Sequence, residues 1–355
     1  MKKLLFIIES IEIGGTQKNL KILLEYLINE KFQIELLVFR RSIKEIEVPK
    51  SIKISSINLN KESKNFYQKI VNNYFRIVKI RDKLKSFDPD LTISFLTTTN
   101  ILCLIATTFL RSKLLICERN DPCKQSLNRI WLFLRILFLR KNIKILCNSL
   151  SAVKYYKRKG LNSLYIRNFI EIPKKDSGKI TIENFILAVG RLHEQKNYDK
   201  LLFMFSKVLK SYPSLNLVIL GRGCEKKIKE KILEIKIQDN VHVLGHKAPY
   251  LYYKKALFYI SASKYEGVAN SVLEAMCMGK AVVINEELKY NLNEYIEDKV
   301  NGYFVKIEEF DQMITYLMRN KLEREKIGKN AAKTIRRFSN DRIYYEWLKV
   351  FRFEL

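Results

Sequence analysis

Two glutamates, Glu266 and Glu274, stand eight positions apart across a segment that leads from a predicted loop into a predicted helix. The apolar run before them, residues 256–261, is typical of a buried strand, and residues 272–279 have a helical composition that ends at a glycine. Such a junction directs unpaired backbone N–H groups and the positive end of a helix dipole toward a docked anion, which suits a diphosphate. Carboxylates beside it can accept hydrogen bonds from sugar and ribose hydroxyls. The segment therefore indicates a site for a nucleotide sugar.

The alternative interpretation of Glu274 is structural. Ser271 and Glu274 have the spacing of a capping box, in which both side chains only satisfy backbone donors at the start of a helix. The spacing alone favours neither role. Glu266 does not belong to such a box. Its alternative interpretation is that of an ordinary solvated glutamate in a loop.

Two cations follow another predicted strand, residues 185–189. Arg191 comes directly after the strand-ending Gly190, and Lys196 stands five residues further on, before a predicted helix. Ligands bind at the carboxyl edge of parallel sheets, where this turn would lie. A guanidinium can grip a phosphate with two hydrogen bonds and an ammonium can act as a point charge, so the two could neutralise a diphosphate without a metal. The alternative is that Arg191 and Lys196 are simply two surface cations in a chain with 65 Lys and Arg. This alternative becomes weaker when the two cations are considered together with the Glu266 segment.

Glycines and an acidic pair elsewhere give weaker signals. Gly14 and Gly15 follow the first predicted strand and open a helix, where a backbone can approach a phosphate closely, although a plain tight turn is the simpler interpretation. The dinucleotide fingerprint G-x-G-x-x-G is absent there. The segment Asp88-Pro89-Asp90 has the spacing of a metal-binding D-x-D, but its proline indicates a turn before a strand. No metal site is predicted.

The elements that must position these residues alternate along the whole chain. Short apolar strands followed by helical patterns are typical of parallel sheets with helices on both faces. We predict strands at 4–9, 34–39, 91–95, 114–117, 143–148, 185–189, 215–220, 241–244, 257–261 and 281–284. We predict helices at 17–29, 67–85, 200–212, 224–235, 327–337 and 340–353. A break in the pattern near residues 168–173 divides the chain into two Rossmann-like domains.

The net charge of +28 is concentrated in the first half of the 355 residues. Residues 1–168 hold 32 Lys and Arg against 13 Asp and Glu, and residues 169–355 hold 33 against 24. Within residues 111–167, 14 basic and 2 acidic residues are interleaved with aromatic ones. Such a surface attracts an anionic membrane leaflet or a nucleic acid, unless the lysines are spread evenly over a solvated surface. No nucleic acid is expected, because no helix-turn-helix, zinc or RNP motif is present.

Targeting and redox signals indicate a cytoplasmic protein. No apolar run reaches 18 residues, and the apolar N-terminal segment meets Glu9 too early for a secretory signal. The six cysteines lack C-x-x-C spacing and are typical of reduced core thiols, and the three histidines lack the clustered partners of a zinc site.

Taken together, Gly14-Gly15, Gly190-Arg191 with Lys196, and Glu266-x7-Glu274 resemble glycosyltransferase family 4, a group of retaining GT-B enzymes, over most of the chain. The resemblance implies an α/β fold of two Rossmann-like domains whose parallel sheets face each other across a cleft. Residues 1–168 would bind the acceptor and 169–339 the nucleotide-sugar donor, while a terminal helix of about 340–355 packs back onto the first domain.

The resemblance also assigns roles to residues. It implies that Arg191 and Lys196 bind the donor diphosphate and act in catalysis with Glu266, which contacts hydroxyls of the transferred sugar. Glu274 would hold the ribose. The remaining donor-binding residues would be Gly15, Gly190, Gly267, Val268, Ala269 and Asn270. Many family members carry a histidine near the reaction centre in the first domain, and no histidine precedes His193 here, so a histidine-assisted step is not predicted.

The activity implied is that of a retaining hexosyl- or N-acetylhexosaminyl-transferase that needs no metal or cofactor. It would move a sugar from a nucleoside diphosphate sugar, a UDP-sugar, to a glycan or lipid-linked oligosaccharide in O-antigen, capsule or lipopolysaccharide synthesis. Residues 94–100 and 117–122 resemble acceptor-facing segments of members that extend cell-surface glycans. The basic first domain is expected to hold the protein peripherally on the anionic inner leaflet. The alternatives are a catalytically silent GT-B subunit that binds membrane and partner enzymes, a basic nucleic-acid-binding protein and a GT-B epimerase.

Overall fold

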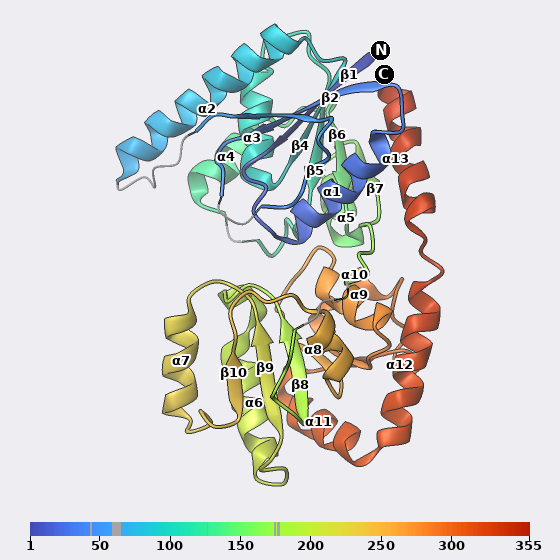
Figure 1. The fold of residues 1–355 in the computed structure, drawn as a ribbon. Helices are drawn as coiled ribbons and strands as arrows, with labels where there is room; N and C mark the ends of the chain where they lie inside the picture. The colour runs from blue at the N-terminus through green and yellow to red at the C-terminus, as the bar shows by residue number, and fades with distance from the viewer. Residues whose placement is uncertain (43–44, 59–64, 126, 174, 176–177) are drawn as a thin grey trace. The chain divides into compact units, whose positions relative to one another are not determined.

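The computed structural model of the protein describes residues 1–42, 45–58, 65–125, 127–173, 175 and 178–355 (Figure 1). The chain forms two compact units. Unit 1 consists of Met1–Phe169 together with Asn340–Leu355, and unit 2 consists of Ile170–Ser339. The first unit thus ends one residue after the boundary expected from the sequence, and the last 16 residues return to it.

Unit 1 is built on a seven-stranded parallel sheet. Its strand order is β3-β2-β1-β4-β5-β6-β7, so the winding direction reverses between β1 and β4. The strands are β1 (Lys2–Ile8), β2 (Phe32–Val38), β3 (Lys53–Ser56), β4 (Leu91–Phe95), β5 (Leu114–Glu118), β6 (Lys144–Cys147) and β7 (Ser163–Tyr165). A reversal of this kind opens a crevice at the carboxyl ends of the strands, where ligands bind in open α/β folds.

Helices cover both faces of this sheet because successive strand side chains point in opposite directions. In β1, Leu4, Phe6 and Ile8 pack into one core cluster, and Leu5 and Ile7 pack into another. The first cluster is shared with α1 (Gly15–Leu27) and α13 (Asn340–Glu354). The second is shared with α2 (Phe66–Phe87), α3 (Thr97–Ala106), α4 (Arg129–Phe138) and α5 (Leu150–Arg158).

The terminal helix α13 contributes core residues to unit 1. Trp347 and Phe351 are buried in the cluster that also holds Phe95 of β4. At the helix surface, the Tyr26 hydroxyl donates to Asp341 Oδ1 at 2.7 Å, and Arg167 donates to Glu346 Oε1 at 2.5 Å. Both apolar burial and polar contacts therefore hold α13 on this unit.

Unit 2 repeats the same principle with a six-stranded parallel sheet of order β10-β9-β8-β11-β12-β13. Its strands are β8 (Phe185–Val189), β9 (Asn216–Leu220), β10 (Val241–Val243), β11 (Tyr259–Ser261), β12 (Val282–Asn285) and β13 (Tyr303–Val305). One face is covered by α6 (Tyr198–Leu209), α7 (Glu225–Glu234) and α11 (Phe310–Arg319), and the other by α8 (Tyr250–Lys255), α9 (Asn270–Cys277) and α12 (Lys321–Ile335). The predicted class of two Rossmann-like α/β domains is confirmed.

Three strands were not predicted from the sequence. Strands β3 and β13 lie at the edges of their sheets, and the short β7 closes the other edge of the first sheet. These strands span only three or four residues, and runs this short give a weak apolar signal, so the pattern misses them. No helix within the described ranges is long and apolar enough to cross a membrane.

Candidate functional site

A loop between β11 and α9 carries Glu266, and two amides hold this loop in place. Gln195 Nε2 donates to the Tyr265 carbonyl at 2.7 Å, and Asn291 Nδ2 donates to the Glu266 carbonyl at 2.9 Å. Gln195 is 7% exposed and Asn291 is 8% exposed, so both amides are largely shielded from water. Because buried hydrogen bonds of this kind are costly to break, they fix the backbone that presents the carboxylate.

The Glu266 side chain forms an ion pair with Lys196. The distance from Lys196 Nζ to Glu266 Oε1 is 2.6 Å, and the side chains are 15% and 13% exposed. The second carboxylate oxygen lies 3.3 Å from Gln195 Nε2. Two residues that the sequence separates by 70 positions are thus brought together, and their opposite charges stabilise each other in a partly dehydrated place.

Gly190 leaves the space that Lys196 occupies. A Cβ atom on Gly190 would lie 2.5 Å from Lys196 Cε and 2.9 Å from its Nζ, so the lysine crosses directly over the glycine at the end of β8. Gly221, at the end of β9, packs still closer, since a Cβ there would lie 1.7 Å from the Gly190 carbonyl oxygen. Both glycines therefore serve close packing, one against a side chain and one against backbone.

The capping-box alternative for Ser271 and Glu274 does not hold. Helix α9 begins at Asn270 with Ala269 as the N-cap residue, which makes no side-chain capping hydrogen bond, so Ser271 already lies inside the first turn. Ser271 Oγ instead lies 2.8 Å from the Tyr259 hydroxyl, and Glu274 Oε2 lies 3.1 Å from the Tyr253 hydroxyl. Tyr259 of β11 thus contacts the serine, and Tyr253 of α8 contacts the glutamate. Glu274 therefore does not serve as the capping residue of its own helix.

Three tyrosine hydroxyls form a polar layer beneath the Glu266 loop. The Tyr198 hydroxyl donates to the Gly190 carbonyl at 3.1 Å, and the Tyr259 hydroxyl lies 3.3 Å from the Val189 carbonyl. Burial raises the pKa of Tyr198, Tyr253 and Tyr259, and the nearby carboxylates of Glu266 and Glu274 add to the effect. These hydroxyls therefore stay protonated at neutral pH and can donate.

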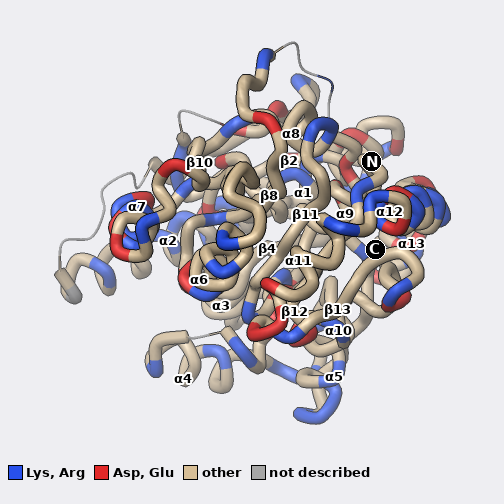
Figure 2. Tube along the Cα trace, turned by 90° about the horizontal axis from the view of Figure 1, so that it is seen from below, with Lys and Arg blue, Asp and Glu red and all other residues tan. Residues whose placement is uncertain are grey.

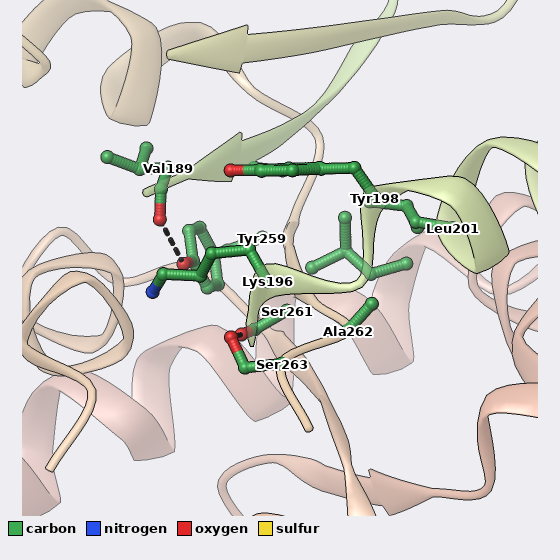
Figure 3. Close-up of a pocket in the computed structure, with 10 residues that line it drawn as sticks. Val189, Lys196, Tyr198, Leu201, Tyr259, Ser261, Ala262 and Ser263 are labelled. Atoms are coloured by element: carbon green, nitrogen blue, oxygen red, sulfur yellow. Dashed lines mark hydrogen bonds between the residues drawn. The ribbon is translucent and has the colours of Figure 1, made fainter. Parts of the chain in front are cut away.

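A small hollow with room for about one water molecule lies at the ends of β8 and β11 in unit 2 (Figure 3). Lys196, Tyr198, Tyr259, Ser261 and Ser263 contribute its polar groups. Figure 3 shows the Lys196 side chain beside the Tyr259 hydroxyl, and the Ser261 and Ser263 hydroxyls 3.3 Å apart on the same wall. Pockets for complete ligands are larger, about 300–1,000 Å³. The hollow as it stands is therefore much smaller than such a pocket.

Arg191 lies on the exposed turn that follows β8. Its charge acts on the Glu266 loop: burial and then Glu266 raise the pKa of Tyr265, and the Arg191 guanidinium opposes the rise. The backbone of residues 267–270 leads into α9, with Val268 and Ala269 buried. Gly15 is the first residue of α1 and belongs to unit 1, and its predicted contact with a donor stays a prediction.

In unit 1 the two predicted acceptor segments meet at the carboxyl ends of neighbouring strands. Glu118, 2% exposed, accepts a hydrogen bond from Thr97 Oγ1 at 3.0 Å and from the Tyr156 hydroxyl at 3.0 Å. Burial raises the pKa of this carboxyl. Leu96, with φ at 77°, turns the chain from β4 into α3 in a conformation that favours glycine. The bond from Thr97 to Glu118 and a second one from Asn100 Nδ2 to the Cys117 carbonyl, at 3.0 Å, join residues 94–100 to residues 117–122.

Sequence reasoning missed several residues of the unit 2 site. Gln195 stands inside the segment between Arg191 and Lys196, and its amide type was the one available signal. Asn291, Tyr198 and Tyr259 carry no spacing signal relative to Glu266. Their contacts arise because β8, β11 and α10 (Lys289–Leu292) meet at one sheet edge in the fold.

The fold places the protein in the GT-B class of two Rossmann-like domains. Sucrose-phosphate synthase from Thermosynechococcus elongatus superimposes with a TM-score of 0.84 at 14% identity, over 99% of this chain and 98% of that one. The Anabaena protein HepE in complex with UDP gives a TM-score of 0.75 at 17% identity, over 99% and 100%. At such identities the likeness shows the fold.

Sequence comparison then narrows the class. Residues 169–334 match the family described as glycosyl transferases group 1, a span that nearly coincides with unit 2. An N-acetylgalactosaminyltransferase from Campylobacter jejuni, named for an acceptor of N-acetylgalactosamine and N,N'-diacetylbacillosamine on diphospho-undecaprenol, is 28% identical over 94% of each chain. These matches support a glycosyltransferase.

Proposed function

We propose that the protein is a retaining glycosyltransferase that moves a sugar from a nucleoside diphosphate sugar to a lipid-linked oligosaccharide or related cell-surface glycan. The observation that carries this proposal is the ion pair of Lys196 and Glu266 beside the start of α9. It sets a cation suited to phosphate next to a carboxylate suited to sugar hydroxyls, inside the span that matches glycosyl transferases group 1.

The donor that we propose is a UDP-sugar with a hexose or N-acetylhexosamine. The UDP in the HepE complex and the N-acetylgalactosaminyl group in the name of the Campylobacter relative support this choice. Lys196 and Arg191 would hold the diphosphate, together with the backbone of Gly190 and residues 267–270. Glu266 would accept hydrogen bonds from the transferred sugar and Glu274 from the ribose.

The reaction that we propose is a same-face substitution. The bond between the anomeric carbon and the phosphate oxygen breaks through an oxocarbenium-like state, and the acceptor hydroxyl forms the new bond on the same face. The departing phosphate takes the hydroxyl proton. Arg191, Lys196 and the amino end of α9 stabilise the negative charge that develops on the leaving diphosphate, so a metal is not required.

The acceptor side of the proposal rests on unit 1. The edge formed by residues 94–100 and 117–122 would contact the acceptor, and the basic surface of this unit would attract the anionic leaflet in which a lipid-linked acceptor is presented. A lipid diphosphate acceptor is supported by the name of the Campylobacter relative.

The first experiment measures donor binding and turnover. UDP should raise the melting temperature of the purified protein, and one member of a nucleotide-sugar panel should be hydrolysed slowly and transferred to lipid extracts, with the product identified by mass. Glu266→Ala and Arg191→Ala should both lose transfer. The exposed residues Glu308 and Arg319 supply matched controls, Glu308→Ala and Arg319→Ala, which should keep it.

Undiminished transfer by both site variants would overturn the assignment. UDP binding without turnover of any donor would instead favour the catalytically silent subunit. Loss of transfer in EDTA, restored by a divalent cation, would contradict the metal-independent mechanism.

A further inference from the structure

Helix α4 buries the charged Arg135 and leaves several large apolar side chains exposed. Arg135 is 5% exposed and is the buried residue of this helix. Phe133, Ile136 and Leu137 are 62%, 64% and 59% exposed, and Ile130 is 46% exposed. A surface helix of a globular domain normally buries its apolar stripe and leaves charges in water. The reversed arrangement leaves a group of large apolar side chains together on the surface, which marks an interaction site.

The orientation of α4 is fixed by specific contacts. Arg135 donates to the Tyr155 hydroxyl at 2.9 Å, and its guanidinium lies 5.4 Å from the centre of the Tyr155 ring. Trp131 and Phe138 of the same helix pack against the core cluster of unit 1. Since the inner face is held by a buried cation and two aromatic rings, the outward apolar face is a built feature of the fold.

Positive charge lies at the ends of α4 and on the neighbouring helix α5. Residues 122–170 contain no Asp or Glu. Lys159 lies 5.0 Å from the same Tyr155 ring that Arg135 contacts, so the basic end of α5 stands beside α4. The exposed basic residues of the two helices and their ends are Arg129, Arg140, Lys141, Lys154, Lys157, Arg158 and Lys159. Figure 2 shows α4 and α5 with blue segments and without red ones.

Charge decides between the candidate partners. A second copy of this chain would bring an identical basic surface against the first, and the like charges would repel. A bilayer with anionic lipids offers an apolar layer for Phe133 and Ile136 and negative headgroups for the lysines around them. We propose that α4 and the basic end of α5, the α4–α5 surface, dock the protein on an anionic lipid bilayer. This inference rests on the proposed function in one respect: a lipid-linked acceptor would be presented at such a bilayer.

Vesicle co-sedimentation of the full chain tests the surface. The protein should bind vesicles that contain phosphatidylglycerol and bind phosphatidylcholine vesicles weakly. The variant Phe133→Ser with Ile136→Ser should lower the partition coefficient at least about tenfold, because two large apolar side chains lose their burial. Leu322→Ser, on an 83% exposed leucine of α12, removes comparable apolar surface from unit 2 and should bind like the wild type.

Two double variants, each of which removes two lysines, measure the electrostatic contribution to vesicle binding. Lys154→Gln with Lys157→Gln should weaken binding to anionic vesicles at low salt. Lys226→Gln with Lys227→Gln, two exposed lysines of α7, removes the same charge from unit 2 and should weaken it less. Equal losses in both pairs would show that net charge alone drives binding and would overturn the assignment to α5.

Two further results would overturn the inference. One is wild-type vesicle binding by the Phe133→Ser, Ile136→Ser variant. The other is a wild-type dimer, seen by light scattering, that this variant converts to a monomer, since the partner would then be a second copy. The UDP-induced shift in melting temperature is measured on the same samples and should be equal in all of them. If the wild type shows no such shift, the proposed function fails while the vesicle result stands on its own.

Discussion

The ammonium of Lys196 lies 2.6 Å from a carboxylate oxygen of Glu266, and the two residues come from different βα turns of unit 2. The pair places a cation where it can meet a phosphate without leaving the carboxylate buried and uncompensated. Removing one partner of such a pair strands the charge of the other. The effects of substituting Lys196 and Glu266 are therefore expected to be coupled.

Replacing Lys196 should abolish most of the activity. Because the ammonium would meet charge that develops on the leaving diphosphate, Lys196→Ala should lower kcat by about 10²–10³-fold, the usual effect of losing one preorganised donor. Lys196→Arg should keep part of it, since the charge remains but the planar guanidinium has a different shape. Initial rates with the donor found in the panel measure both, with the exposed Lys200→Ala as the control. A wild-type kcat in Lys196→Ala would contradict the role.

Two alanine substitutions at neighbouring strand ends should have different effects. In Gly190→Ala the new Cβ meets the flexible Lys196 side chain at 2.5 Å, so the lysine is displaced and activity falls while the fold persists. In Gly221→Ala the new Cβ would lie 1.7 Å from the backbone oxygen of Gly190, so the strand ends must separate and unit 2 loses stability. Melting temperatures and initial rates of both variants provide the comparison.

If Gly190→Ala instead lowered the melting temperature and Gly221→Ala lowered only the activity, movement of the Lys196 side chain would not be relieving the clash at Gly190. A stable Gly221→Ala with normal activity would show that the two turns have more room than the structure gives them.

The central strands could be predicted from the sequence because they depend on continuous apolar runs. Residues 91–95 and 185–189 are buried on both faces of a sheet, so their composition alone sets their limits. Strand β3, with the sequence Lys53-Ile54-Ser55-Ser56, pairs along one side and remains polar, which hides it from the same criterion. The reversed exposure of α4 also could not be predicted, because its apolar residues have the composition of a core helix.

The placement of the candidate residues could be predicted where chemistry and turn geometry coincide, while their roles stay predictions. Arg191, Lys196 and Glu266 follow strand ends, and the carboxyl ends of parallel strands share one edge of a sheet. The residues that hold them, such as Gln195 and Asn291, act through contacts across sequence separations that a single chain does not reveal. The capping-box alternative failed for a local reason: α9 begins at Asn270, so Ser271 lies inside the first turn, where it contacts the Tyr259 hydroxyl.

Unit 2 should lose stability in alkali. The pKa of buried Tyr198 and Tyr253 is raised in the folded state, against about 10 in the unfolded chain. Below pH 10 both states keep these protons, so their contribution is fully present. Above it the unfolded chain releases protons that the native state retains, and the free energy of unfolding falls as the pH rises. Urea unfolding from pH 8 to 11, followed by circular dichroism, measures this fall.

A matched pair of tyrosine variants isolates the buried hydroxyls. Tyr198→Phe should flatten the dependence of stability on pH above 10, whereas Tyr316→Phe, on a 44% exposed tyrosine of α11, should leave it nearly unchanged. Identical slopes in the two variants would contradict the raised pKa of Tyr198.

Trp347 should contribute strongly to the stability of unit 1 by anchoring α13. Trp347 is 2% exposed, and the buried Arg119 guanidinium lies 5.5 Å from its ring and 5.4 Å from that of Phe95. Trp347→Ala therefore opens a cavity and deprives a buried cation of one aromatic face, and it should lower the free energy of unfolding by about 3–5 kcal/mol. Tyr345→Ala, on a 54% exposed ring of the same helix, should change it by less than about 0.5 kcal/mol.

Urea denaturation of the full chain measures both variants, and a double variant tests the mechanism. Arg119 Nη1 also donates to Asn168 Oδ1 at 3.2 Å, so this one side chain contacts both α13 and the last residues of the first segment of unit 1. Because Arg119 and Trp347 are in contact, Arg119→Ala combined with Trp347→Ala should cost less than the sum of the single effects. Additive effects would show that the tryptophan stabilises α13 by apolar burial alone, without help from the guanidinium.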